Sequence, residues 1–310
     1  MTTSLRKQLL ALSVFILGLG AAGAVSAAGN ASASQAADRD KVCTTCHDAS
    51  WPKPILSYYQ TKMGNRADPR TPGCQTCHGP SAAHLKNAGD APDVTFTKNS
   101  KNTEQARNDV CLACHKGDKL THWEGSQHQA QGLDCASCHT VHAPSDPVLN
   151  KRTQPEVCYT CHKTQRAEFN KISHMPLPEG KMACSDCHNP MGSAGPKLLK
   201  KNTVNETCYT CHAERRGPFL WEHPPASDNC LNCHTPHGSN IAPLLKSRPP
   251  FLCDECHNGP HQSASPVGPN VAGYQGGYTG TNPMYGARSC MNCHVMVHGS
   301  NSPAGSLLHR

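Results

Sequence analysis

Cysteine and histidine recur in this sequence as one short pattern whose side chains could bind a metal or a cofactor. The chain of 310 residues contains 20 cysteines and 20 histidines, well above ordinary usage. The pattern is Cys-x-x-Cys-His, and its cysteine spacing can bind zinc, form a redox disulfide or attach a haem covalently. It occurs ten times and consumes every cysteine, namely Cys43, Cys46, Cys74, Cys77, Cys111, Cys114, Cys135, Cys138, Cys158, Cys161, Cys184, Cys187, Cys208, Cys211, Cys230, Cys233, Cys253, Cys256, Cys290 and Cys293.

The order of the five residues favours covalent haem. A helical turn places two thiols three positions apart on one face, so both can add to the vinyl groups on one porphyrin edge, and the next histidine can reach the iron. A zinc ribbon does not need that histidine, and a disulfide scaffold would close very small loops and leave it unexplained. We therefore predict ten haems c with thioether bonds to all 20 cysteines and proximal ligands His47, His78, His115, His139, His162, His188, His212, His234, His257 and His294.

Ten histidines remain outside the motifs, which suggests a second axial histidine at each iron. One group lies roughly a dozen residues after a proximal histidine, and another lies three or four residues after one, with His84 a looser member six beyond His78. The sequence thus predicts distal ligation by His84, His128, His142, His174, His223, His237, His261 and His298.

Methionine occupies two of the positions where other repeats carry a distal histidine. Met63 follows the first motif, and Met191 lies three residues beyond His188. Each could ligate iron, which would raise that haem's potential, or could simply fill a gap. His122, beside a tryptophan, stays open as a ligand, whereas His309 near the C-terminus is expected on the surface.

The composition predicts a fold without an ordinary apolar core. Hydrophobic residues make up 36% of the chain and aromatics 5%, and 25 glycines and 25 prolines interrupt regular elements. We expect a mostly irregular multihaem cytochrome c, with short α-helices at the motifs and little or no β-sheet. The close motif spacing predicts an elongated linear haem stack whose porphyrins fill the interior. Residues 86–108 are expected to form a surface loop, and residues 262–289 a longer connection.

The N-terminus predicts export. Arg6 and Lys7 precede an apolar run to about Val25 and then small residues that suit cleavage, so residues 1–28 read as a signal peptide. We divide the rest into a flexible leader at 29–42, a first pentahaem half at 43–162 and a second at 163–310. No other segment could span a bilayer as a helix, and a periplasmic location follows.

The formal charge of +7 does not indicate a nucleic-acid partner. Two of the positive charges leave with the signal peptide. Each haem would add two propionates that are ionised at neutral pH. The haem-loaded protein is therefore expected to be acidic, which excludes nucleic acid as a partner.

Further segments add a family resemblance. Residues Trp123–His128 read Trp-Glu-Gly-Ser-Gln-His, Cys135–His142 read Cys-Ala-Ser-Cys-His-Thr-Val-His, and the last motif is followed by Val297–Pro303. Together with the ten motifs, these segments are similar to decahaem cytochromes of the Mtr, Mto, Pio and Dms type, which pair with outer-membrane porins. The resemblance runs from about Asp40 to the end.

This resemblance implies a haem wire inside an outer-membrane β-barrel porin, which conducts electrons between the periplasm and the cell exterior. Expected partners are the porin, periplasmic or inner-membrane cytochromes, and an outer-surface multihaem cytochrome or extracellular iron. Such a conductor serves Fe(II) oxidation or reduction of metals and external acceptors, and it is not an enzyme. A soluble periplasmic shuttle is the alternative. A multihaem reductase is a further one, although no Cys-x-x-Cys-Lys motif occurs.

Overall fold

The structure, a computed structural model, describes residues 38–66, 68, 70–257, 290–303 and 305–309. The predicted signal peptide, the leader as far as residue 37, His261 and the long connection at 262–289 lie outside the described residues.

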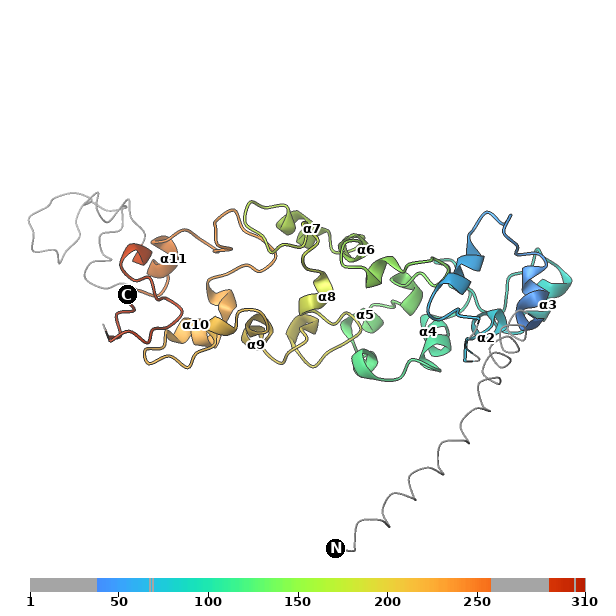
Figure 1. The fold of residues 1–310 in the computed structure, drawn as a ribbon, viewed down its shortest axis with the longest axis horizontal. Helices are drawn as coiled ribbons and strands as arrows, with labels where there is room; N and C mark the ends of the chain where they lie inside the picture. Colours follow the sequence, from blue (N-terminus) through green and yellow to red (C-terminus); the bar gives the residue numbers. More distant parts are fainter. Residues whose placement is uncertain (1–37, 67, 69, 258–289, 304, 310) are drawn as a thin grey trace, which may run out of the picture. The chain divides into compact units, whose positions relative to one another are not determined.

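Short helices separated by irregular chain make up the described residues (Figure 1). No β-strand is present in these parts, and β-type pairing is limited to isolated bridges. The α-helices are α2 (Cys74–His78), α3 (Ala82–Lys86), α4 (Glu104–Leu112), α5 (Gln127–Ala130), α6 (Gln154–Tyr159), α7 (Lys163–Phe169), α8 (Cys184–Cys187), α9 (Val204–Tyr209), α10 (Pro224–Asp228) and α11 (Phe251–Asp254). Further 3₁₀ turns are Ile55–Gln60, Asp118–Leu120, Cys135–Ser137, Pro147–Leu149, Pro196–Leu198, Ala213–Arg215, Cys230–Asn232 and Cys290–Asn292. The prediction of a mostly irregular fold with short α-helices and no sheet is confirmed for the described chain.

Local sequence explains where these helices start and why they are short. The side-chain oxygens of Thr103 and Thr203 accept hydrogen bonds from backbone N–H groups in the first turns of α4 and α9, as N-caps do. Pro155 and Pro224 lie in the first turns of α6 and α10, where proline costs no hydrogen bond. Frequent proline and glycine between the motifs then prevents longer helices.

Backbone contacts divide the chain into two units. The first comprises the described residues up to Cys114 together with Asp134–Asp146, and the second comprises His115–Leu133 and the described residues from Pro147 onward. Within the second unit, the elements follow one another in chain order from α6 and α7 past α8 and α9 to α11 (Figure 1). The boundary between the units falls before residue 163, and the division into pentahaem halves stays a prediction.

Few apolar side chains are buried. Among the described residues they are Tyr58, Trp123, Val148, Tyr159, Phe169, Leu177, Ala183 and Leu245. Tyr159, Phe169 and Leu177 form a small cluster in the second unit, with Met175 and Met182 against it. So small a cluster cannot be the main source of hydrophobic stabilisation in a chain of this length.

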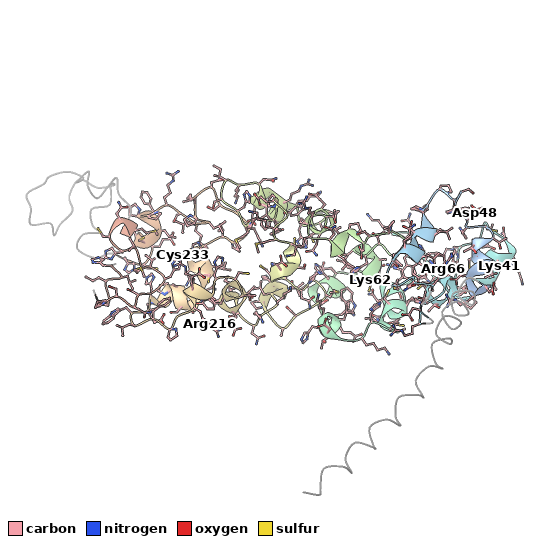
Figure 2. All side chains as sticks on the ribbon, in the orientation of Figure 1. Lys41, Asp48, Lys62, Arg66, Arg216 and Cys233 are labelled. Carbon is pink, nitrogen blue, oxygen red and sulfur yellow. The ribbon has the colours of Figure 1, made fainter. Side chains whose placement is uncertain are left out.

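The end of the predicted leader is helical rather than flexible. Residues 38–44 form a helix, and Asp40 is 2% exposed. Its carboxylate accepts hydrogen bonds from the Tyr59 hydroxyl at 2.7 Å and from the backbone N–H of Cys74 at 3.1 Å. The guanidinium of Arg66, labelled in Figure 2, lies 3.8 Å from the centroid of the Tyr59 ring. These contacts hold the segment in place.

The predicted surface loop at residues 86–108 is also partly wrong. Helix α4 begins at Glu104, and Asn108 within it is 1% exposed. Polar composition misled the prediction, because the buried side chain is polar and hydrogen-bonded. Among the described residues, no helix combines the length and apolar character needed to cross a membrane.

Candidate haem-binding sites

Consecutive motifs are joined in pairs by buried polar side chains. Asn108 lies three residues before Cys111, and its side-chain oxygen accepts a hydrogen bond from the backbone N–H of Cys135 at 2.9 Å. Asn205 lies three residues before Cys208, and it accepts from the N–H of Cys230 at 2.7 Å. Asp40 makes the same link from the first motif to Cys74. Each link therefore fixes the start of one motif against the start of the next.

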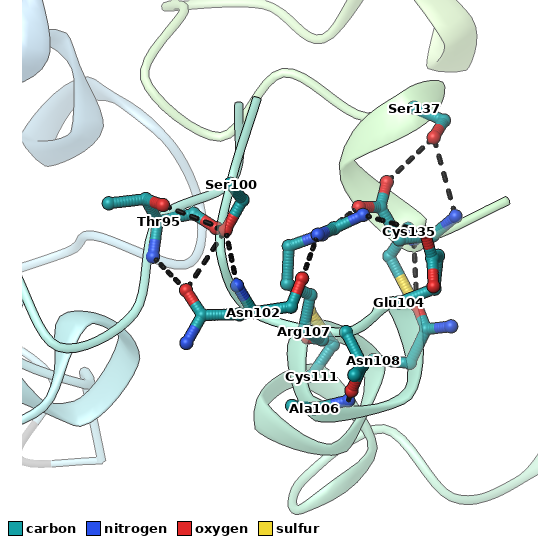
Figure 3. A network of polar contacts seen from close by, with 12 residues as sticks. Thr95, Ser100, Asn102, Glu104, Ala106, Arg107, Asn108, Cys111, Cys135 and Ser137 are labelled. Carbon is teal, nitrogen blue, oxygen red and sulfur yellow. Dashed lines mark hydrogen bonds and ion pairs between the residues drawn. The ribbon is translucent and has the colours of Figure 1, made fainter. Parts of the chain in front are cut away.

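Figure 3 shows this link around Asn108. Arg107 forms a buried ion pair with Asp134, which immediately precedes the fourth motif. The Ser137 hydroxyl donates to Asp134 at 2.7 Å. Burial by itself would raise the pKa of Asp134, but the hydrogen bonds from Ser137 and Arg107 outweigh it and hold the pKa below its usual value. The carboxylate therefore stays charged and keeps the third and fourth motifs together.

The cysteines of the motifs are free of disulfides. All 20 lie among the described residues and none of them forms a disulfide, so each sulfur is available for a thioether bond to haem. The first cysteines of paired motifs are electrostatic neighbours, and the pairs are Cys43 with Cys74, Cys111 with Cys135, Cys158 with Cys184, Cys208 with Cys230 and Cys253 with Cys290.

Six motif histidines face a histidine from outside the motifs at nearly constant separation. Their ring centroids lie between 6.0 and 6.2 Å apart. The pairs are His47 with His84, His78 with His142, His162 with His128, His188 with His237, His257 with His223 and His234 with His298.

This separation fits an iron held between two imidazoles. A metal–imidazole bond is about 2 Å long and the nitrogen lies roughly 1 Å from the ring centroid, so two rings on opposite sides of one metal have centroids roughly 6 Å apart. Rings packed directly on one another can approach more closely, as His294 and His309 do at 4.5 Å. The six pairs thus have the spacing that axial ligands of haem iron need.

Backbone acceptors orient most of these rings. The Nδ1–H group of His78 donates to the Val94 carbonyl at 2.9 Å, and that of His188 donates to the Lys197 carbonyl at 2.9 Å. Because Nδ1 carries the proton in this arrangement, Nε2 keeps its lone pair for a metal. Carbonyl acceptors at Nδ1 serve His78, His84, His128, His142, His174, His188, His223, His234 and His294.

Burial keeps several of these imidazoles in the neutral form that binds metals. It lowers the pKa of His78, His188 and His298 from the usual value, since desolvation disfavours the charged form. A nearby histidine lowers the pKa of each further. Burial therefore favours the neutral form of these three rings.

The remaining candidate ligands among the described residues do not belong to these six ring pairs. The ring of His174 is bound at both nitrogens, with Nδ1 at the Lys171 carbonyl and Nε2 3.0 Å from Glu179. His122 is exposed, and its carbonyl lies against Gly192, where a Cβ atom would approach to 1.9 Å. This glycine follows Met191, so the Met191 loop packs on the backbone of His122. Met63 is partly exposed, and its carbonyl accepts from the Tyr58 hydroxyl at 3.3 Å.

His309 differs from its sequence-based expectation. It is partly buried rather than exposed, and its ring lies 4.5 Å from that of His294. Within the described residues, no partner ring at the common spacing accompanies His115, His139 or His212. The predicted ligand His261 lies outside the described residues.

Known proteins share this motif arrangement. The family model described as a doubled CXXCH motif matches residues 174–217 and 223–263, and the model described as cytochrome c-type protein NrfB-like matches residues 74–155. The chain is 40% identical over 273 residues to multihaem cytochrome MtrA from Shewanella baltica, and this covers 86% of the chain and 80% of that protein. The chain belongs to the MtrA family of multihaem cytochromes.

Membership in the MtrA family, together with the motifs, makes this chain a haem c-binding electron-transfer protein. A shorter similarity, 35% identity over 111 residues, relates it to cytochrome c-type protein NrfB from Haemophilus influenzae and covers 32% of the chain and 49% of that protein. Both relatives are cytochromes, and the predicted resemblance to the MtrA family is confirmed, with multihaem binding of haem c.

Spacing in the sequence did not reveal the polar links between motifs. Asn108 and Asn205 each lie three residues before a motif, and that repeated position is the signal that could have found them. The sequence also did not show which histidines face each other, because the histidine that faces a motif comes from a loop elsewhere in the chain.

Proposed function

We propose that the chain holds ten haems c, one at each motif, and conducts electrons through them. At six of these sites the proximal histidine and its facing partner would be the two axial ligands. These ligand pairs are His47 with His84, His78 with His142, His162 with His128, His188 with His237, His257 with His223 and His234 with His298.

One observation carries this proposal: six imidazole pairs share a centroid separation of 6.0 to 6.2 Å. Unrelated surface histidines would not repeat one distance within 0.2 Å. Two such histidines would occupy both axial positions of an iron and leave none open for substrate, which favours electron transfer over bond chemistry.

The paired motifs support a relay. Haem iron supplies the chemistry by cycling between its ferric and ferrous states. The chain's own part is to hold neighbouring sites close together, and Cys111 lies near Cys135 as Cys208 lies near Cys230. Asn108 and Asn205 fix those positions through buried hydrogen bonds. Rigid spacing of this kind suits repeated transfer from one site to the next.

We further propose that the relay runs through an outer-membrane porin between the periplasm and the cell exterior. The predicted signal peptide and the family resemblance support this location, and a roughly 40–45 Å membrane is a distance that a stack of haems can cover. Periplasmic or inner-membrane cytochromes would exchange electrons at one end, and a surface cytochrome or extracellular iron at the other.

Two measurements on the exported protein test this function. Electron paramagnetic resonance of the ferric protein should show low-spin haems at every site that has a histidine pair. Membrane fractionation should recover the protein with an outer-membrane barrel protein. Recovery as a free protein in the periplasmic fraction would support the soluble shuttle instead, and a high-spin ferric signal that shifts on adding small ligands would support a reductase.

A further inference from the structure

Two histidines of the proposed haem sites have a carboxylate oxygen within hydrogen-bonding distance of Nδ1. Nδ1 of His237 lies 3.1 Å from the Glu168 carboxylate, and Nδ1 of His139 lies 2.6 Å from the Asp146 carboxylate. At nine other histidines this position is taken by a neutral backbone carbonyl. A carboxylate brings a full negative charge to the ligand.

The chain holds Glu168 at this position. Glu168 lies in the last turn of α7, and its own backbone carbonyl contacts Gly238, the residue after His237. A Cβ atom at Gly238 would lie 2.0 Å from that carbonyl oxygen, so only glycine allows the loop to approach α7 so closely. The close packing brings His237 within reach of the Glu168 side chain.

Asp146 is held in a comparable way. One carboxylate oxygen contacts His139, and the other accepts the backbone N–H of Thr140 at 3.3 Å. The Asp146 side chain is 15% exposed, so water screens its charge only partly. A third acidic neighbour, Glu214, lies 3.6 Å from Nδ1 of His212, and both of these side chains are more than half exposed. Its influence is therefore weakened by solvent.

We propose that Asp146 and Glu168 set low reduction potentials at two sites of the relay, the one held by His139 and the one held by His188 and His237. This inference rests on the proposed haem ligation. A carboxylate that accepts the Nδ1–H bond increases the basicity of Nε2. A more basic ligand, together with a nearby negative charge, stabilises ferric iron relative to ferrous iron. Asp146 and Glu168 act as positioning residues, since they touch the ligand and not the metal.

The consequence is a relay with two uphill steps. The haems held by these residues would pass an electron from one iron to the next, so that one iron would be reduced as its neighbour is oxidised, with no bond formed or broken. Sites with carbonyl acceptors keep higher potentials than the two carboxylate sites. The two carboxylates would therefore limit the rate of passage, and they would do so for flow in either direction.

Redox titration of the full-length haem-loaded protein, followed by its absorption spectrum, tests the inference. Glu168→Gln and Asp146→Asn keep an oxygen that can accept the Nδ1–H bond but remove the charge. Each should move one low-potential component upward and leave the rest of the curve in place. Glu156→Gln is the matched control, because it removes one negative charge at an exposed residue that pairs with Arg166 and touches no histidine. Glu168→Asp keeps the negative charge, so its potential should rise less than that of Glu168→Gln.

The outcomes separate this inference from the proposed function. If Glu168→Gln and Asp146→Asn titrate like Glu156→Gln while keeping every haem, the carboxylates do not set the potentials and the inference is wrong, although the relay stands. If the unaltered protein shows no low-spin haem with two histidines, the proposed function itself fails. Electron paramagnetic resonance adds a second reading, since loss of the carboxylate should shift the low-spin g values of one haem. Unshifted g values in both variants would also contradict the inference.

Discussion

His234 and His298 face each other with almost parallel rings. Their centroids are 6.1 Å apart and their planes differ by 8°, although the residues lie on distant parts of the sequence. Burial lowers the pKa of His298, which keeps its nitrogen free to bind metal. We take this pair as the clearest example of the proposed ligand geometry.

Replacing His298 should therefore remove one axial ligand. In His298→Ala, the haem at His234 is expected to become high-spin in the ferric state, with the loss of one low-spin haem signal. The exposed residue Val295 lies on the same segment, so Val295→Ala is the control and should keep the original spectrum. An unchanged spectrum in His298→Ala would remove His298 from the ligand set.

At the first motif, the structure favours a histidine over a methionine as the second ligand of the iron. His47 faces His84 at 6.0 Å, so Met63 is not needed at that iron. We expect Met63→Leu to leave the spectrum and potentials of the first haem unchanged, and His84→Met to raise its potential, because thioether ligands favour ferrous iron. Redox titration of both variants measures this. If the potential of the first haem falls in Met63→Leu and stays unchanged in His84→Met, then Met63 rather than His84 is its second ligand.

A regular offset of two motifs links five of the six facing pairs, and the exception is His84, which follows the second motif and faces the first. His142 follows the fourth motif but faces the second, and His237 follows the eighth but faces the sixth. His128 and His223 follow the third and seventh motifs and face the fifth and ninth. In each case the partner comes from two motifs away.

This offset makes a prediction for His174, which follows the fifth motif as His223 follows the seventh. It should serve the seventh haem, whose proximal ligand is His212. His174→Ala is expected to convert that one haem to high-spin, whereas Glu179→Gln, which alters only the His174 contact at Nε2, should not. Resonance Raman spectroscopy counts the high-spin haem. The offset would be wrong for this repeat if His174→Ala kept every haem low-spin.

The motifs, the short helices and the lack of sheet in the described residues could be predicted from the sequence because they depend on local spacing. The facing pairs could not. His84 lies six residues after His78, yet it faces His47, because the turn between α2 and α3 carries it back to the first motif. The contact of Glu168 with His237 depends on a close approach at Gly238, which involves residues far apart in the chain. Side-chain type shows what can bind, and only packing shows which groups meet.

The buried pair of Arg107 and Asp134 predicts a pH dependence of stability. The pKa of Asp134 is lower in the folded protein than its usual value. Its contribution is therefore fully present above about pH 4, the usual carboxyl range, and is lost as the pH falls through the lowered folded pKa. Asp134→Asn should lower the free energy of unfolding by about 3 kcal/mol at neutral pH and flatten the acid dependence.

Urea unfolding followed by circular dichroism measures the free energy of unfolding. The measurement covers about pH 2 to 7, which is roughly the range over which carboxyl groups titrate. Asp109→Asn is the control, since Asp109 is an exposed acid on α4, the helix that carries Arg107, and its side chain accepts a hydrogen bond from Gln105. This substitution should change stability by less than about 0.5 kcal/mol. Equal acid sensitivity in Asp134→Asn and the unaltered protein would contradict the account.

The intact mass of the exported protein tests the central claim most directly. The account predicts the mature polypeptide plus ten covalently attached haems, with one haem lost for each motif whose two cysteines are replaced by alanine. A mass equal to the bare polypeptide, or zinc in place of haem iron, would contradict it.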